Sequence, residues 1–308
     1  MTAVSSKSVT LPILNNVLVR AKEGLVELTT TNLEIAVVAS VRAKVETPGV
    51  FTVPAKTLAD YVGLLSDERV EIELKDDQLL VSSSKSKTKM KGESAEEFPV
   101  VPEAQGGVTL TFASKALKEA LSKVVFSVSR SDVRPELSGV LFHANAEGAK
   151  GVLTMAATDS FRLSEKRIAI QNDQKEQEVR CIVPARTIQE LIRAISASDQ
   201  ELLEITIADG QLVAKAGDTQ IVSRLIEGNY PDYRQIIPQD FGATARLQTG
   251  NLAQQMRAAS LFSTTGVNAV SFQFAPEDKS IKLAAANTQL GEFSSALEGE
   301  VSGQEHTV

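Results

Sequence analysis

The chain has 308 residues, of which 43% are apolar, and this length and composition predict a globular protein of more than one domain. Its single cysteine, Cys181, excludes an internal disulfide, and no apolar run approaches the roughly 20 residues of a membrane span. We therefore expect a cytoplasmic protein without a membrane partner. The net charge of -7 excludes a protein that covers nucleic acid with its whole surface, although it allows a basic face on one side.

The N-terminal part of the chain is predicted to form strands, then a helix and a hairpin. We interpret PILNNVLVRAKEGLVELTTTNLEIAVVASV, residues 12–41, as strands joined by turns. In residues 51–84, apolar side chains recur with the spacing of one helix face at Leu58, Tyr61, Val62 and Leu65. The alternating runs VEIEL and LLVSS, joined by Lys-Asp-Asp, predict a hairpin. This part closes on EEFPVVP, residues 96–102.

A second copy of the pattern opens with a strand and a helix that the first copy lacks. The segment TLTFASKALKEALSKVVFSVS carries an apolar helix face at Leu117, Leu121, Val124 and Val125. The next segment, PELSGVLFHANAEGAKGVLTMAATDSFRLSEKRIAI, matches residues 12–41 and places Thr158-Asp159 over Thr31-Asn32. The sequence therefore contains an internal repeat, and this strand segment is part of it.

The second copy continues with a counterpart of the first helix and hairpin. Residues 181–217 match residues 51–84, because both carry Val-Pro-Ala-basic-Thr followed by a helix face and two short alternating runs. The helix face in this copy is Ile188, Leu191, Ile192 and Ile195. The copy closes on EGNYPDYRQIIP, residues 227–238, the longer relative of EEFPVVP.

A third copy is fainter and stops early. A helix containing Leu252 and Met256 precedes residues 267–301, in which Asn287-Thr288 takes the place of Thr31-Asn32. The repeated unit is therefore strand, helix, strands, helix, strands. We predict domains at residues 1–104, 105–240 and 241–308, of which only the second is complete. The first lacks its opening strand and helix and the third its second half, so we expect a chain that is incomplete at both ends.

These segments resemble the bacterial DNA polymerase III beta subunit, the sliding clamp, from Thr10 to about Val301. The likeness rests on TLPILNNVLV, SDVRPELSGVLF, AATDSFRLS, IVPARTIQELI and EGNYPDYRQIIP. The resemblance implies an α+β fold of repeated DNA-clamp domains, with helices lining a central channel and antiparallel sheets on the outer rim. It also implies a DNA replication protein that encircles duplex DNA regardless of sequence and tethers the polymerase, which confers processivity. The implied partners are DNA polymerase III, clamp loader subunits, other proteins with a clamp-binding motif, and a second copy of the chain in a head-to-tail homodimer ring.

Helix faces opposite the apolar stripes lean positive, as suits a surface that attracts phosphates without reading bases. Helical spacing places Arg186, Glu190 and Arg193 on one such face. Basic residues are common on any solvated helix, but their recurrence on several helices favours a DNA-facing role.

The resemblance also brings Arg130 and Arg134 near the DNA path, although Arg134 could instead bond loop carbonyls. The predicted DNA-facing residues are Lys56, Lys115, Lys123, Arg130, Arg134, Arg186 and Arg193.

The resemblance implies a pocket that takes short extended peptides of partner proteins between the second and third domains. The residues that match its wall are Leu137, Thr158, Ser160, Phe161, Arg162, Leu163, Pro231, Gln235 and Ile236. Apolar members of this set offer buried area, and Pro231 sets the chain direction. The alternative is that Leu163 and Ile236 belong to the core of a domain junction. The family completes this pocket with apolar C-terminal residues that have no counterpart here.

The resemblance implies a dimer interface between the first and third domains. The matching positions are Thr88 and Met90 on the strand SKSKTKMKG, and Leu261 and Phe262 after the third-copy helix. Lysines alternate along that strand, as expected of a sheet edge protected from indiscriminate pairing.

An enzymatic function has little support in the sequence, because the phosphate-binding, dinucleotide-binding, nucleophile-elbow and metalloprotease motifs are all missing. A metal site built from Cys181, His143 and His306 conflicts with the close spacings that such sites favour. We predict no catalysis, no metal and no cofactor. The alternative function is an incomplete clamp relative that cannot close a ring and acts as a peptide-binding adaptor or has no function.

Overall fold

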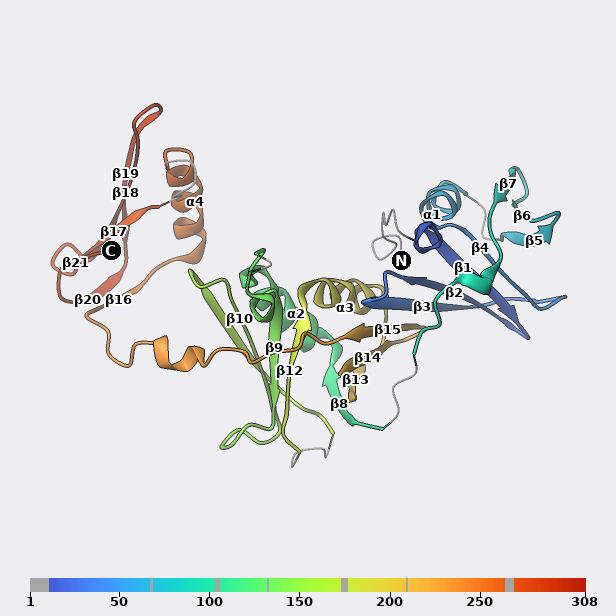
Figure 1. Cartoon of the computed structure of the whole chain (residues 1–308). Helices are drawn as coiled ribbons and strands as arrows, with labels where there is room; N and C mark the ends of the chain where they lie inside the picture. Colours follow the sequence, from blue (N-terminus) through green and yellow to red (C-terminus); the bar gives the residue numbers. More distant parts are fainter. Residues whose placement is uncertain are drawn as a thin grey trace. The chain divides into compact units, whose positions relative to one another are not determined.

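The computed structural model describes residues 11–66, 69–102, 106–131, 133–172, 177–208, 210–263 and 269–308. The chain divides into two compact units, Met1–Tyr230 and Pro231–Val308 (Figure 1). Within the described ranges, no helix is both long and apolar enough to cross a membrane. Helices interspersed with antiparallel sheets confirm the predicted α+β class.

The first unit begins with the predicted strands, helix and hairpin. Its elements in chain order are a 3-10 helix at Pro12–Asn15, β1 (Asn16–Lys22), β2 (Leu25–Thr31), β3 (Ile35–Arg42), β4 (Gly49–Pro54), α1 (Ala55–Gly63), β5 (Glu71–Lys75), β6 (Gln78–Ser82), β7 (Lys87–Lys91) and a 3-10 helix at Ala95–Glu97. The hairpin of β5 and β6 turns at Asp76 and Asp77, both of which have positive φ. Lys-Asp-Asp is therefore the turn that the sequence predicts.

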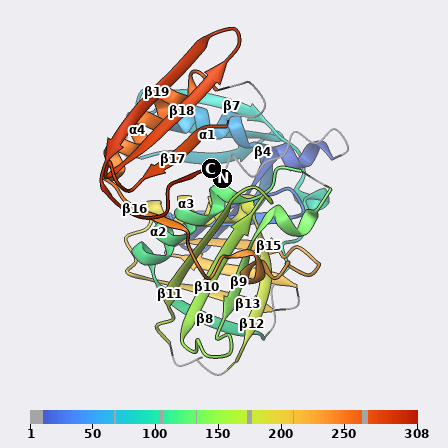
Figure 2. The same ribbon diagram turned by 90° about the vertical axis from the view of Figure 1, so that its left-hand side faces the viewer.

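The second copy repeats this order after an opening strand and helix. Its elements are β8 (Val108–Ala113), α2 (Ser114–Val124), 3-10 helices at Val125–Ser127 and Pro135–Leu137, β9 (Gly139–Ala144), β10 (Val152–Thr158), β11 (Leu163–Ala169), β12 (Val179–Pro184), α3 (Ala185–Ala197), β13 (Leu202–Ala208), β14 (Gln211–Ala216) and β15 (Thr219–Arg224). Figure 2 shows β11, β10 and β9 side by side in a four-stranded sheet that ends at β12.

The second unit contains a shorter run of the same elements. They are a 3-10 helix at Tyr233–Ile236, β16 (Ala243–Arg246), α4 (Thr249–Ser260), β17 (Ser271–Ala275), β18 (Ser280–Asn287), β19 (Gly291–Glu298), β20 (Glu300–Gly303) and β21 (His306–Thr307). One sheet has the order β19-β18-β17-β21, and β16 pairs with β20. The helix α4 packs against β18 and β19, with Leu252 and Met256 beside the buried Ile281 and Leu283.

Antiparallel pairing of β3 with β15 joins the first and second copies into one sheet. The eight strands have the order β4-β1-β2-β3-β15-β14-β13-β8. Ala36 lies opposite Val222 and Val37 opposite Ile221. Because Ile35 and Val37 also belong to the apolar core of the second copy, the two copies share packing as well as hydrogen bonds.

Helices α2 and α3 pack against each other over the core of the second copy (Figure 1). From α2, the fully buried side chains include Leu117, Leu121 and Val124, all of which the spacing predicts. From α3, Ile188 and Leu191 are fully buried. The Val-Pro-Ala signature marks a strand that passes directly into a helix, since Pro184 ends β12 and precedes α3.

The prediction for α1 is wrong at its C-terminal end. The helix ends at Gly63, so Leu65 lies beyond it, and Val62 is 39% exposed. Leu58 is buried as predicted. In the second copy the corresponding helix is longer, because α3 continues through Ile195, which is buried.

The same position of the repeat is covered in one copy and open in the other. Ile205 of β13 faces Ala214 of β14, and Ile72 of β5 faces Val81 of β6. Ile205 is 1% exposed because β8 pairs with β13 and α2 packs beneath, whereas Ile72 is 44% exposed. In the described part of the chain, β5 pairs with β6 only.

This difference predicts unequal costs for one substitution. Ile205→Ala should lower the free energy of unfolding by about 2–5 kcal/mol, because it opens a cavity in a closed core. Ile72→Ala at the matching site should cost about 1 kcal/mol or less, because its side chain is already half exposed. Urea denaturation followed by circular dichroism measures both, and equal losses would contradict the comparison.

Candidate DNA-facing and partner-binding surfaces

Tyr230 of the closing phrase EGNYPDYRQIIP holds the end of the first unit in place. Its ring is 4% exposed, and its hydroxyl oxygen accepts a hydrogen bond of 3.0 Å from the backbone N–H of Thr158. The Arg180 side chain donates to the Tyr230 carbonyl through Nη2 at 3.0 Å. Burial raises the pKa of the Tyr230 hydroxyl to about 12, so it stays neutral at physiological pH. The aromatic therefore anchors the turn that follows β10.

That turn, residues 158–163, is held by its own side chains. Thr158 Oγ1 donates to the Arg162 carbonyl at 2.7 Å and accepts from the N–H of Ser160 at 3.1 Å. Asp159 Oδ1 accepts the N–H groups of Phe161 and Arg162, each at 3.0 Å. Ser160 takes a φ of 76°, which is left-handed and uncommon for a residue other than glycine. The turn is therefore rigid without help from a ligand.

The same capped turn occurs in all three copies, with a correction to the predicted alignment. Asn32 Oδ1 accepts the amides of Glu34 and Ile35, and Asn287 Oδ1 accepts those of Gln289 and Leu290. Asn287 thus plays the part of Asn32 and Asp159. Ala286, rather than Asn287, takes the place of Thr31, so the predicted register is wrong by one residue.

Charge and aromatic groups gather around the second-copy turn. Arg162 Nε donates to Asp159 Oδ2 at 3.0 Å, and its guanidinium lies 5.6 Å from the centre of the Phe126 ring. Burial raises the pKa of the Asp159 carboxyl, but the amides of Arg162 and Phe161 and the Arg162 charge outweigh it, and the net pKa is lowered. Phe161 at the tip is 97% exposed. Phe126 was not singled out from the sequence, because nothing before folding places it beside Arg162.

The residues predicted to form the partner-peptide pocket differ in accessibility. Leu137 and Thr158 are buried, Leu163 is half-buried, and Ser160, Phe161 and Arg162 are exposed. Pro231, Gln235 and Ile236 belong to the second unit. There Gln235 Nε2 donates to Asp232 Oδ2 at 2.9 Å, and Ile236 is largely exposed. Assembly of these residues into one pocket stays a prediction.

Most residues of the predicted DNA-facing set are exposed side chains that also pair with a nearby carboxylate. Lys123 Nζ lies 2.7 Å from Glu119, Arg134 Nε lies 3.0 Å from Glu136, and Lys56 pairs with Asp60. Lys115 and Arg130 are exposed and Arg186 is half-buried. A surplus of cations remains, since α2 holds three lysines against one glutamate and α3 two arginines against one glutamate.

Glu190 does not lie on the solvated face that helical spacing assigned to it. Its side chain is buried, and it pairs with the exposed Arg193 one turn further along α3. The buried carboxylate therefore holds Arg193 against the helix. This arrangement corrects the prediction that Glu190 shares a solvated helix face with Arg186 and Arg193.

The predicted dimer positions fall into two kinds. Met90 is 6% exposed and packs in the core of the first copy, so its side chain cannot act as an interface contact. Thr88 is half-buried on β7, an edge strand of its sheet. Leu261 is exposed, and the Phe262 ring stacks on Phe293 of β19 with centroids 6.2 Å apart.

A repeat of helices packed on antiparallel sheets, in which β3 and β15 join the first and second copies edge to edge, defines a DNA-clamp type of protein. Two family models match the chain, DNA polymerase III beta subunit, N-terminal domain, at residues 2–102, and DNA polymerase III beta subunit, central domain, at residues 111–232. The chain belongs to the bacterial beta sliding clamp family, and its function is that of a DNA sliding clamp, a processivity factor. The adaptor alternative is not favoured by these matches.

Relatives match over most of the chain. The chain is 31% identical to the beta sliding clamp of Synechococcus elongatus, over 95% of this chain and 78% of that one. It is 31% identical to the beta sliding clamp of Proteus mirabilis, over 96% of this chain and 79% of that one. The crystal structure of a DNA polymerase sliding clamp from Bacillus subtilis has a TM-score of 0.89 at 27% identity, covering 99% of this chain and 81% of that one.

The repeated turn predicts that asparagine replaces Asp159 with little loss. Asp159→Asn keeps the acceptor that Asn32 and Asn287 supply, so we expect a loss of about 0.5 kcal/mol or less, whereas Asp159→Ala should cost about 1–2 kcal/mol. Because folding lowers the Asp159 pKa, its stabilisation is present above the ordinary value of 3.8 and is lost as the pH falls.

Equilibrium unfolding at neutral and acid pH, with amide exchange at Phe161 and Arg162, measures these effects. Asp159→Asn should lose less stability than the unmodified chain on acidification. Fast exchange in the asparagine variant would refute the capping role.

Proposed function

We propose that two copies of the chain close head to tail into a ring around duplex DNA, in the cytoplasm, and hold the polymerase there without chemistry of their own. The observation that carries the proposal is the β3–β15 joint between the first and second copies. The repeat supplies counterparts of both strands, β19 for β3 and β7 for β15. Both are edge strands of their sheets. The same joint can therefore form between the third copy of one chain and the first copy of the next.

The registers within each copy fix which residues would meet. Gln78 lies opposite Lys91 as Gln211 lies opposite Arg224, so Lys89 corresponds to Val222. On the other strand, Ala286 lies opposite Glu292 as Thr31 lies opposite Ala36, so Glu292 corresponds to Ala36.

In the joint between two chains, Glu292 of one chain therefore takes the place of Ala36, and Lys89 of the other chain takes the place of Val222. In the same way, Phe293 takes the place of Val37, and Thr88 takes the place of Ile221.

Chemistry at these positions supports the pairing. Opposite charges facing each other across strands stabilise a sheet, and Lys89 and Glu292 are both exposed. Phe293 is already backed by Phe262, one of the residues predicted for the interface. Thr88 would lie against this aromatic pair. Met90 takes part through its backbone only, because its side chain is buried.

The helices support a DNA-facing role through long-range attraction rather than tight contacts. Ion pairs with Glu119 and Glu136 restrain Lys123 and Arg134 at the surface, where such pairs contribute little stability, and the buried Glu190 restrains Arg193. A modest cationic surplus attracts phosphates without reading bases, which permits sliding. We propose that Lys56, Lys115, Lys123, Arg130, Arg134, Arg186 and Arg193 face the DNA.

We propose that the second-copy turn binds the peptides of DNA polymerase III, clamp loader subunits and other clamp-binding proteins. Its self-capped backbone is preformed, which lowers the entropic cost of binding. The exposed Phe161 and half-buried Leu163 offer apolar area, and Arg162 offers a charge. Expected affinities lie near micromolar, roughly -8 kcal/mol, which suits partners that exchange.

A charge-swap experiment tests the ring joint. Lys89→Glu or Glu292→Lys alone places like charges across the strands and should weaken self-association about tenfold, since each chain contributes to two joints. The double variant restores the opposite pair and should regain most of the affinity. Sedimentation velocity measures the dimer dissociation constant.

Lys75→Glu provides the matched control for that swap. It makes the same charge change on β5, an exposed strand of the same sheet, and should leave the dimer intact. If the double variant associates as weakly as the singles, the proposed register is incorrect.

Retention on DNA tests the function itself. The chain, once loaded, should stay on a nicked circular duplex and leave when the circle is cut, because topological retention requires a closed ring. Lys115→Glu with Lys123→Glu should reduce the salt slope of binding by roughly 2, at about 0.9 for each phosphate contact. The control variant, Lys75→Glu with Lys215→Glu, carries the same charge change on exposed strand positions and should leave the salt slope of binding unchanged. Equal retention on linear and circular DNA would contradict encirclement.

A further inference from the structure

The first copy carries an apolar face that the described residues leave uncovered. Val62 lies in the last turn of α1, Leu64 follows the helix, and Ile72 and Leu74 lie on β5 (Figure 1). All four side chains are exposed, and we call them the open face. Large apolar side chains that gather on one surface indicate a contact with another molecule, whereas single ones need no explanation.

The strand β5 also has a free edge. In the described part of the chain it pairs with β6 only, and no backbone hydrogen bond from another segment reaches it. Ile72 lies opposite Val81 and Leu74 opposite Leu79, and both partners are buried in the core of the first copy. The exposed side chains of β5 therefore lie on the core face of the sheet, beside an edge that can accept another strand.

The second copy contains counterparts of these residues that are covered. The hairpins of β5 with β6 and of β13 with β14 share one register, which matches Ile72 with Ile205. The helices α1 and α3 match from their first residues, which matches Val62 with Ile192. Ile205 is buried, and Ile192 packs against the core of the second copy. The open face is therefore a position that a complete copy of the repeat covers.

In the second copy, the cover is the strand β8 followed directly by the helix α2. Leu110 of β8 lies opposite Ile205 of β13, and α2 packs against α3. The inward side chains Leu110, Phe112, Leu117 and Leu121 are all buried. An alternating strand that continues into an amphipathic helix is therefore the pattern that fits the open face.

We propose that the open face binds a strand–helix segment of a separate polypeptide, by strand addition to β5 and helix packing beside α1. Within the described residues, the two segments of this kind already have places. β8 and α2 cover the second copy, while β16 pairs with β20 and α4 packs against β18 and β19. The site uses β5 rather than β7, so it does not depend on ring closure or on the turn at residues 158–163.

A peptide with the sequence of the β8–α2 segment is the probe for this site on the full chain. The probe is acetyl-VTLTFASKALKEALSKVV-amide, which copies residues 108–125. Its matched control carries Leu117→Asp and Leu121→Asp, which keep the strand but remove the apolar face of the helix.

Methyl groups of isoleucine and leucine, labelled for NMR, report where the probe binds. We expect saturable shifts at Leu64, Ile72 and Leu74 with the probe and none with the control peptide. Ile205 should not shift, because β8 already fills the matching place. Ile281 of the second unit should not shift either.

Variants of the chain separate the open face from general apolar attraction. Ile72→Thr keeps a β-branched side chain but removes apolar surface, and it should weaken binding of the probe about tenfold. Val41→Thr makes a similar change at an exposed position of β3 and should leave binding unchanged.

A disulfide cross-link tests the register. A probe with Leu110→Cys should link to the chain with Ile72→Cys, because the repeat places these residues opposite each other. It should not link to Glu73→Cys, whose side chain points to the other face of the sheet. Cys181 should not compete, because burial raises the pKa of its thiol to about 12 and keeps it neutral.

Three results would overturn the proposal. The first is the lack of saturable shifts at the open face, and the second is equal binding of the probe and its control. The third is weaker self-association of Ile72→Thr without any peptide, which would identify a contact between copies of the chain. The charge swap at Lys89 and Glu292 tests the ring joint separately, so the failure of either proposal can be recognised.

Discussion

Antiparallel pairing between β3 and β15 is the interaction on which the arrangement of the first unit depends. It merges strands from two copies into one sheet and brings Val37 into the same core as Ile221. A slip of one residue would move every side chain of β3 to the other face, so the apolar pattern holds the register firmly. The joint also provides a geometric rule that can be extended to two further edge strands, β19 and β7. Ring closure is thus an extension of a contact that the chain already makes with itself.

The capped turn after each second strand shows how one local device serves different purposes. Asn32, Asp159 and Asn287 accept the same pair of backbone amides in the three copies. Only in the second copy does a carboxylate take this role, and there it also holds Arg162. The Tyr230 hydroxyl ties this turn to the end of the unit. A preformed turn with exposed Phe161 is a surface that can bind a peptide without first becoming ordered.

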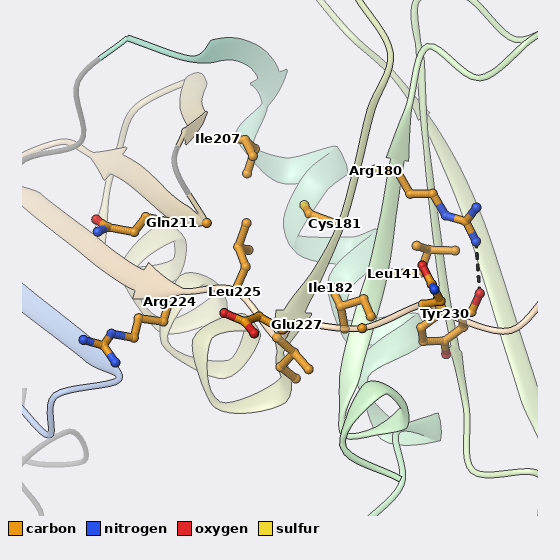
Figure 3. A pocket seen from close by; sticks show the side chains of 14 residues that line it. Leu141, Arg180, Cys181, Ile182, Ile207, Gln211, Arg224, Leu225, Glu227 and Tyr230 are labelled. Carbon is orange, nitrogen blue, oxygen red and sulfur yellow. Dashed lines mark hydrogen bonds between the residues drawn. The ribbon is translucent and has the colours of Figure 1, made fainter.

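Cations of the first unit differ in how they are held. Lys123 and Arg193 pair with carboxylates of their own helices, which leaves a diffuse positive surplus suited to mobile phosphates. Arg180 of β12 is instead held by the backbone carbonyl of Tyr230, at the end of the first unit (Figure 3).

Local pattern alone determined the repeat, the helix faces of α2 and α3 and the hairpin turns, because periodicity and turn chemistry act over a few residues. The family followed from the resemblance of longer segments such as EGNYPDYRQIIP. Local pattern failed where distant segments decide the outcome. Glu190 is buried, Met90 belongs to a core, and Val62 is exposed because of packing that no short window contains. Tertiary structure alone brought Tyr230 to Thr158, Arg162 to Phe126 and Arg180 to Tyr230. Such contacts join residues far apart in the chain, and their geometry exists only once the sheets have paired.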